Sequence, residues 1–161
     1  MVFEKANEND IAGLTELRTA YLLEDYGMIE SGALSSIAAQ LPAYFMRHLN
    51  KDLLAFVCRD GDSIVGCCFL LVSEKPPNPA FITGRTGTVL NVYTKPAYRK
   101  KGVARRLMQA LLSEAADLKL DDVDLKATDS GYPLYRSLGF EDAQSKYRPM
   151  QYRMGTPYGK N

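Results

Sequence analysis

Residues 103–120 form an amphipathic pattern that is clearer than that of any other segment of the chain. Apolar residues recur there at steps of three and four, and no proline interrupts them. The residues of this stripe are Val103, Leu107, Ala110, Leu111, Ala115 and Leu118. β-rich runs stand on both sides, at 88–94 and 123–127. A strand, a long helix and another strand in this order predict a sheet with the helix packed on its face.

The remaining segments extend this pattern in both directions. We expect a strand at 2–5, helices at about 11–22 and 34–49, a hairpin of strands 53–58 and 63–72, a long loop at 74–87, a short helix at 132–138 and one or two strands within 140–153. Pro42 is expected to kink or split the second helix. The prediction is one domain over residues 1–161, of the α/β class, with a central mixed sheet flanked by helices.

Composition excludes several classes of protein. The 161 residues include 20 basic and 19 acidic ones, for a net charge of +1, so nothing in the overall charge favours a nucleic acid or an anionic membrane as partner. Three cysteines, two of them adjacent, make a poor disulfide framework, and the sole histidine, His48, has no companions for a zinc site. We therefore expect reduced, buried thiols and no metal. With no signal segment and no long apolar run, we expect a cytoplasmic location.

A basic turn, Arg99-Lys100-Lys101-Gly102-Val103-Ala104, lies between the strand at 88–94 and the long helix. A chain that passes from a strand into a helix exposes backbone N–H groups without intrahelical partners, and these attract anions. Glycine lets a phosphate come close to the backbone. The turn is neither a dinucleotide-binding G-x-G-x-x-G nor a P-loop. It therefore predicts a phosphate cradle, with a solvated loop or a nucleic-acid patch as the alternatives.

Two motifs resemble the GNAT superfamily of N-acetyltransferases. Residues 91–104 are similar to its strand and its R/Q-x-x-G-x-G/A loop, with Ala104 where glycine is commoner. Residues 134–140, Leu-Tyr-Arg-Ser-Leu-Gly-Phe, are similar to its L-Y-x-x-x-G-F signature. The resemblance implies the GNAT fold and an acetyl-CoA-dependent N-acyltransferase. Such an enzyme passes the acetyl group directly to a primary amine of a small molecule or a protein, in a ternary complex and without an acyl-cysteine.

The resemblance also implies which residues bind the cofactor. These are Val92, Tyr93, Thr94, Arg99, Lys100, Lys101, Gly102, Val103, Ala104 and, in a loop where the family often has asparagine, Ser130. The strand end 92–94 would pair with the pantetheine arm, and the amide of Val92 or Tyr93 would stabilise the oxyanion. Tyr135 corresponds to the family's general acid, which protonates the departing CoA thiolate. Its alternative role is packing at the end of a short helix, which is how we interpret Tyr98 and Tyr132.

No motif identifies the base that takes the proton of the amine. Asn91 could order a water molecule, whereas Glu24, Asp25, Glu30 and Asp129 are either candidate bases or ordinary surface charges. A catalytically silent CoA-binding sensor or structural module is the alternative function. No motif identifies the acceptor amine, and a homodimer is the candidate assembly.

Overall fold

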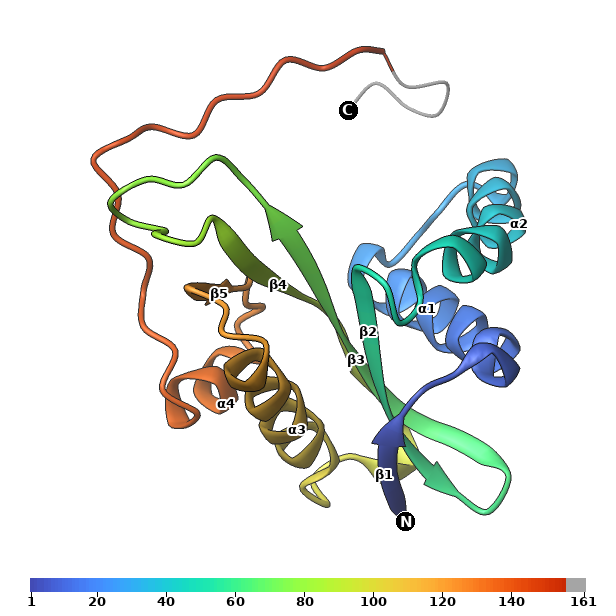
Figure 1. Cartoon of the computed structure of the whole chain (residues 1–161). Coiled ribbons are helices and arrows are strands. Elements are labelled where there is room, and N and C mark those ends of the chain that lie inside the picture. The colour runs from blue at the N-terminus through green and yellow to red at the C-terminus, as the bar shows by residue number, and fades with distance from the viewer. Residues whose placement is uncertain (156–161) are drawn as a thin grey trace.

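The computed structural model describes residues 1–155, which contain a five-stranded sheet with helices on both faces (Figure 1). The elements in chain order are β1 (Val2–Lys5), η1 (Glu8–Asp10), α1 (Ile11–Tyr26), α2 (Ser31–His48), β2 (Leu53–Asp60), β3 (Ser63–Glu74), β4 (Arg85–Thr94), η2 (Pro96–Tyr98), α3 (Val103–Asp117), β5 (Asp122–Asp124) and α4 (Tyr132–Ser137). The predicted mixed sheet with flanking helices is confirmed. Residues 156–161, which the predicted single domain includes, lie outside the described part.

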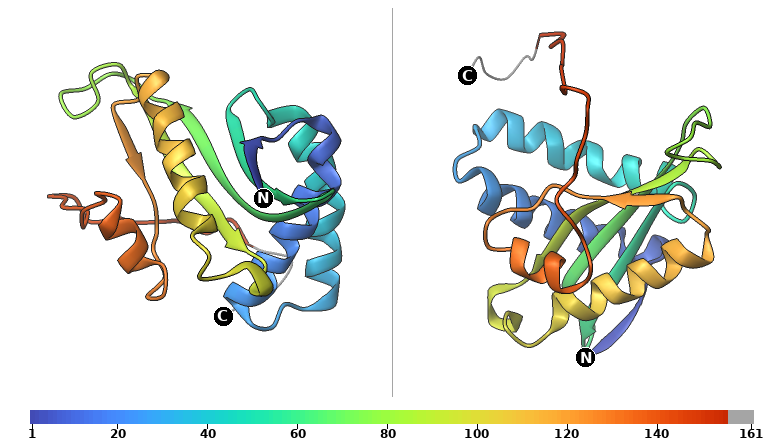
Figure 2. Two further views of the ribbon diagram at one scale, coloured as in Figure 1. Left: turned by 90° about the horizontal axis from the view of Figure 1, so that it is seen from below. Right: turned by 90° about the vertical axis from the view of Figure 1, so that its left-hand side faces the viewer.

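The strands lie in the order β1-β2-β3-β4-β5, and only the β4–β5 pair is parallel. Neighbouring side chains of a strand point to opposite faces, so β2 contributes Leu53, Ala55 and Val57 to one core and Leu54, Phe56 and Cys58 to the other. The first core is closed by α1 and α2, and the second by α3. Figure 2 shows these helices on opposite sides of the sheet, with α4 on the side of α3.

The start of α3 lies close against the sheet because β3 has a glycine at that point. A Cβ placed on Gly66 would come within 2.8 Å of Val103 Cγ1 and 3.2 Å of the Tyr93 carbonyl oxygen. A side chain at Gly66 would therefore push the first turn of α3 outward. This contact positions the basic turn next to the end of β4.

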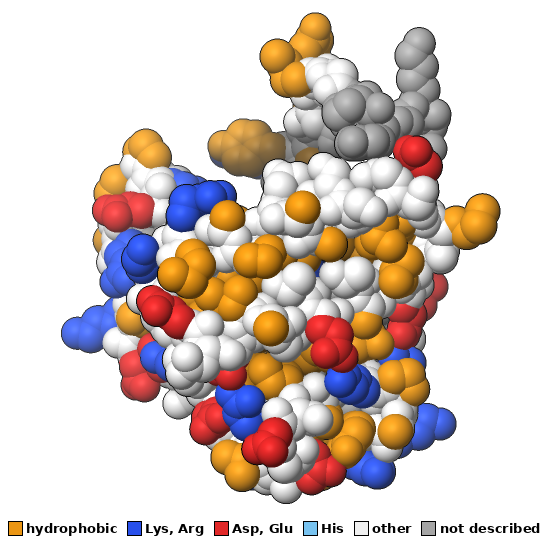
Figure 3. Space-filling model, turned by 90° about the vertical axis from the view of Figure 1, so that its right-hand side faces the viewer, with side chains coloured by type: hydrophobic (Ala, Val, Ile, Leu, Met, Phe, Trp, Pro, Cys, Tyr) orange, Lys and Arg blue, Asp and Glu red, His pale blue; other side chains and the backbone are white. Residues whose placement is uncertain are grey.

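Two helical predictions need adjustment. Pro42 lies inside α2 without splitting it, and the helix begins at Ser31, before the predicted start. Pro42 is exposed, so water can reach the carbonyl that its missing N–H leaves free, while the buried Phe45 holds the helix on the sheet. Figure 3 shows hydrophobic side chains along the side of the molecule on which α1 and α2 lie, with charged side chains mainly toward its left and lower parts.

β4 carries a bulge at Asn91, whose φ of 53° is left-handed. Phe69 pairs with Leu90 and Cys67 pairs with Tyr93, so Asn91 and Val92 together oppose one residue of β3. A bulge of this kind bends its strand and re-aims the side chains beyond it. The predicted loop at 74–87 is also shorter than expected, because Glu74 and Arg85 already pair.

β5 is only three residues long and ends before the predicted 127. It pairs with β4 at residues 86–88 and no further. Beyond Thr88, the outer edge of β4 has no neighbouring strand within residues 1–155. The sheet therefore opens between β4 and β5, next to the bulge.

The prediction of one or two strands within 140–153 is wrong. Residues 141–155 form exposed chain without strand structure, which runs from α4 across the upper part of Figure 1. The charged and polar stretch at 141–146 offers no apolar face to bury, and Pro149 lacks the N–H that a sheet ladder requires.

Candidate active site

The turn before α3 presents unpaired backbone amides on one side. Lys100 and Gly102 both have left-handed backbones, with φ of 59° and 78°. The N–H groups of Gly102, Val103 and Ala104 donate to no other group among residues 1–155. The two left-handed residues turn the chain sharply, and successive N–H groups in such a turn make a concave anion site. The N-terminal end of the α3 dipole adds to the attraction for an anion.

These amides lie at a hollow of about 240 Å³. It is lined by Thr94, Tyr98, Arg99, Lys100, Gly102, Val103, Ala104, Arg105 and Leu134. Six of the predicted cofactor residues thus come together around one space. Lys101 does not line it, since its ammonium lies 5.2 Å from the centre of the Tyr98 ring. Ser130 does not line it either, and its hydroxyl is 3.2 Å from that of Thr128.

Arg99 is held toward α1. Its Nε donates to the Thr94 carbonyl at 2.9 Å, its Nη2 donates to Glu24 at 2.6 Å, and its guanidinium carbon lies 5.6 Å from the centre of the Tyr93 ring. The hydrogen bond to Glu24 raises the pKa of Arg99, which keeps it a cation. Because Glu24 balances this charge, the attraction for an anion comes mainly from Lys100, Arg105 and the backbone amides. Sequence reasoning missed this pair, whose members are 75 residues apart.

Tyr135 lies beside β5 in a second, larger hollow of about 780 Å³, together with Val123, Leu125 and Phe140. Its ring packs edge-on against that of Phe140, with 6.0 Å between centres. Burial, with smaller contributions from the neighbouring Tyr21 and Cys68, raises the pKa of Tyr135 to about 12. Its hydroxyl has no hydrogen-bond partner in the described part of the chain. The phenol is therefore protonated at neutral pH and free to donate.

Tyr98 and Tyr132, the two tyrosines predicted to pack, differ from Tyr135 because their hydroxyls have hydrogen-bond partners. The Tyr98 hydroxyl donates to Asp60 at 2.8 Å, and the Tyr132 hydroxyl donates to Asp142 at 3.0 Å. Tyr98 does pack partly against the α3 core, whereas Tyr132 is 41% exposed. Both hydroxyls are occupied, so of these three tyrosines Tyr135 is the one whose hydroxyl is free to donate to a ligand.

The candidate bases are not brought together by the fold. Glu24 is ion-paired with Arg99, and Asp25, Glu30 and Asp129 are exposed. Asn91 is buried, and both ends of its amide are in use: Oδ1 accepts from Arg18 at 3.2 Å, and Nδ2 donates to Cys67 Sγ at 3.2 Å. The role of ordering water, predicted for Asn91, would use the second lone pair of Oδ1 or the second N–H of Nδ2.

All three cysteines are buried and unpaired, and the adjacent pair points to opposite faces of the sheet. Burial raises the pKa of the Cys67 thiol to about 12 and also raises the pKa values of Cys58 and Cys68. Within residues 1–155, no three His, Cys, Asp or Glu side chains are grouped closely enough to hold a metal ion.

Since only the thiolate reacts with an alkylating agent, we expect the native thiols to be nearly inert. Iodoacetamide at pH 7.5 should label Cys58, Cys67 and Cys68 at least ~100-fold more slowly in the native protein than in guanidinium chloride. Mass spectrometry of the alkylated peptides measures the three rates. Rapid labelling of any one thiol in the folded protein, or an acetyl group found on it after incubation with acetyl-CoA, would show that this thiol is accessible and able to react.

The fold and the site thus define an α/β protein with an open sheet edge beside a turn of unpaired backbone amides. Residues 51–142 match the model of the acetyltransferase (GNAT) domain. This match covers more than half of the chain, and the chain therefore belongs to the GNAT family of acetyltransferases. None of the helices in residues 1–155 has the length and hydropathy needed to cross a membrane.

Solved structures show the same fold. A predicted acetyltransferase from Clostridium acetobutylicum, solved with acetyl-CoA, is 26% identical, with a TM-score of 0.80 over 93% of this chain and 95% of that one. A GCN5-related N-acetyltransferase from Ralstonia eutropha JMP134 is 22% identical, with a TM-score of 0.75 over 92% and 97%. A ribosomal-protein-alanine N-acetyltransferase from Brucella melitensis is 18% identical, with a TM-score of 0.67 over 96% and 100%. Among curated proteins, none is a significant match in sequence.

Proposed function

We propose that this chain, as the single domain expected over residues 1–161, transfers the acetyl group of acetyl-CoA to a primary amine by direct attack in a ternary complex. The observation that carries the proposal is the hollow at Gly102, with its unpaired amides beside the open edge of β4. The Clostridium acetobutylicum relative, whose structure contains acetyl-CoA, supports the choice of cofactor. The buried, unpaired thiols suit a reducing compartment, and we include the cytoplasm in the proposal.

In this proposal the amides at 102–104 and the Lys100 ammonium bind the pyrophosphate of CoA. The pantetheine arm then runs along the unpaired edge of β4 at residues 92–94 and takes the place of a neighbouring strand. The bulge at Asn91 supports this arrangement, because it re-aims the next amides, those of Val92 and Tyr93, at the point where the thioester carbonyl would lie. One of these two amides stabilises the oxyanion.

The reaction forms a C–N bond and breaks a C–S bond. The neutral amine attacks the thioester carbonyl carbon, the tetrahedral intermediate collapses, and CoA leaves as a thiolate while the amine proton passes to water or a surface carboxylate. An ordinary thiol has a pKa of about 8.5, below that of Tyr135. Full proton transfer from the phenol is therefore unfavourable at first. The role that suits Tyr135 is a hydrogen bond to sulfur that strengthens as negative charge builds there.

A screen of amines tests the proposal against the silent CoA-binding module. The purified protein is mixed with acetyl-CoA and a panel of small primary amines and N-terminal peptides, and release of free thiol is followed over time. We expect release above the rate of uncatalysed hydrolysis with at least one amine. Tight binding of acetyl-CoA by calorimetry without release for any amine would favour the silent module, and no binding would contradict both functions.

A further inference from the structure

Arg18, on α1, is a partly buried cation with no acidic partner. No Asp or Glu of residues 1–155 lies within 4.0 Å of its guanidinium. By contrast, Arg59 pairs with Glu4 and Asp10, and Arg99 pairs with Glu24. A guanidinium has five N–H donors, and the hydrogen bond that Arg18 makes is that from Nη1 to Asn91 Oδ1 at 3.2 Å. Most of its donors are therefore free to bind an added anion.

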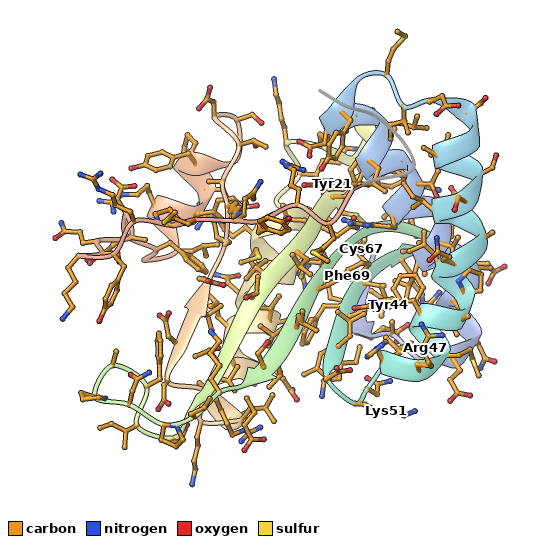
Figure 4. The ribbon with its side chains drawn as sticks, turned by 90° about the horizontal axis from the view of Figure 1, so that it is seen from above. Tyr21, Tyr44, Arg47, Lys51, Cys67 and Phe69 are labelled. Atoms are coloured by element: carbon orange, nitrogen blue, oxygen red, sulfur yellow. The ribbon has the colours of Figure 1, made fainter. Side chains whose placement is uncertain are left out.

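The surroundings of Arg18 are aromatic and apolar. Its guanidinium carbon lies 5.6 Å from the centre of the Tyr21 ring. Burial raises the pKa values of the Tyr21 and Tyr44 phenols and of the Cys67 thiol, and the positive charge of Arg18 opposes the rise at all three. Figure 4 shows Tyr21, Cys67, Phe69 and Tyr44 following one another along the α1/α2 face of the sheet. Next to such groups, which exclude water, a charge pair is stronger than in bulk solvent.

Arg18 also lies close to the proposed reaction centre. It contacts Asn91, the bulge residue, and the next two amides are those assigned to the oxyanion. Tyr21, beside Arg18, packs edge-on against Tyr93 and is near enough to Tyr135 to raise its pKa. An acceptor bound at Arg18 therefore has its other end near the thioester.

We propose that the acceptor is a small amino-carboxylate, whose carboxylate binds Arg18 while its amine attacks acetyl-CoA across the Asn91 bulge. The inference rests on the proposed acetyltransferase function and gives that function a substrate class. Planar guanidinium and carboxylate groups match in two parallel hydrogen bonds, so Arg18 selects for carboxylate rather than for charge alone. Lysine at this position would keep the charge and lose the two parallel hydrogen bonds.

The test compares acids with their amides. The probes are glycine, L-alanine, L-phenylalanine, β-alanine and 4-aminobutyrate, each beside its carboxamide, with thiol release as the readout. For at least one pair we expect kcat/KM to favour the acid by about 100-fold, the order of magnitude for a charge-assisted bidentate contact. Arg18→Gln should bring that ratio to about 1 by lowering kcat/KM for the acid alone, and Arg18→Lys should retain only part of it.

Arg47→Gln is the matched control. It removes the same charge from an exposed site on α2 that has no acidic partner in the described residues. We expect it to leave the acid-to-amide ratio, the melting temperature and the affinity for acetyl-CoA unchanged. Figure 4 shows Arg47 and Lys51 at the far end of the row that begins at Tyr21.

The outcomes separate the two proposals. Turnover of neutral amines with no preference for any acid in the parent protein overturns the amino-carboxylate inference and leaves the acetyltransferase intact. Equal loss of acid and amide turnover in Arg18→Gln, with acetyl-CoA affinity retained, assigns Arg18 to the support of Asn91 and also overturns the inference. Turnover of peptide N-termini, with no turnover of any of the amino acids, also overturns the amino-carboxylate inference. An absence of turnover with every amine overturns the acetyltransferase proposal itself. The ratio of kcat/KM for acid to kcat/KM for carboxamide is measured on the parent protein. The inference can therefore still be tested if Arg18→Gln does not fold.

Discussion

Gly102→Glu is expected to abolish acetyl-CoA binding, with a Kd at least ~100-fold weaker than that of the parent protein. A Cβ at Gly102 meets no protein atom within 4 Å, so a new side chain extends into open space on the side of the cradle. A carboxylate there would fill the site of the pyrophosphate and repel its charge. Isothermal titration calorimetry with acetyl-CoA measures the loss directly.

The control for this variant is Gly61→Glu, in the turn between β2 and β3. Gly61 also has a left-handed backbone, with φ of +57° against +78° for Gly102, and its Cβ position is equally open. Both substitutions should lower the free energy of unfolding by about 1–2 kcal/mol, the cost of a left-handed L-residue. Only Gly102→Glu should lose acetyl-CoA. Parental affinity in that variant would place the cofactor elsewhere on the protein.

Tyr135→Phe should lower kcat by roughly 10- to 100-fold and leave the Kd for acetyl-CoA nearly unchanged. This is the range for the loss of one hydrogen bond to a charged group that forms in the transition state. The ring and its packing on Phe140 remain in this variant, so melting should barely change. Tyr135→Ala should lose turnover and also lose stability, because it leaves a cavity. Single-turnover kinetics keep product release out of the comparison.

A matched control and a pH profile sharpen the test. Tyr132→Phe removes the neighbouring hydroxyl of α4, which is bound to Asp142, and should keep the parental kcat. Because burial raises the pKa of Tyr135 to about 12, above its ordinary value near 10, the phenol stays protonated as the pH rises. Turnover should therefore not fall between pH 8 and 10 through ionisation of Tyr135. A parental kcat for Tyr135→Phe, with chemistry rate-limiting, would remove Tyr135 from the mechanism.

The parts of the fold that sequence reasoning located are those determined by local chemistry. The apolar stripe from Val103 placed α3, and the β-rich runs at 53–58 and 63–72 placed the β2–β3 hairpin. The anion turn was recognised for the same reason: its glycine, its basic residues and the helix after it are adjacent in the chain. The prediction of a late strand within 140–153 was wrong because residues 141–155 have no apolar face to bury.

Sequence patterns do not predict the side-chain contacts around the Asn91 bulge. Arg18 meets Asn91 across 73 residues, and Glu24 meets Arg99 across 75. In the sequence, Arg18 is one charge on a helix, and Glu24 is a candidate base. Only the packing of α1 on β4 shows that the first is a cation with free donors and that the second is neutralised.

The short pairing of β5 with β4 has a thermodynamic consequence for a protein that binds acetyl-CoA at the open edge. A ligand that occupies this edge binds the folded chain and has no site on the unfolded one, so mass action links cofactor supply to folding. At a free concentration 100 times its Kd, such a ligand adds about 2.7 kcal/mol to the free energy of unfolding. That increment is a large share of the 5–15 kcal/mol typical of a domain. The abundance of the folded protein would then follow the acetyl-CoA level of the cell, apart from any effect of that level on turnover.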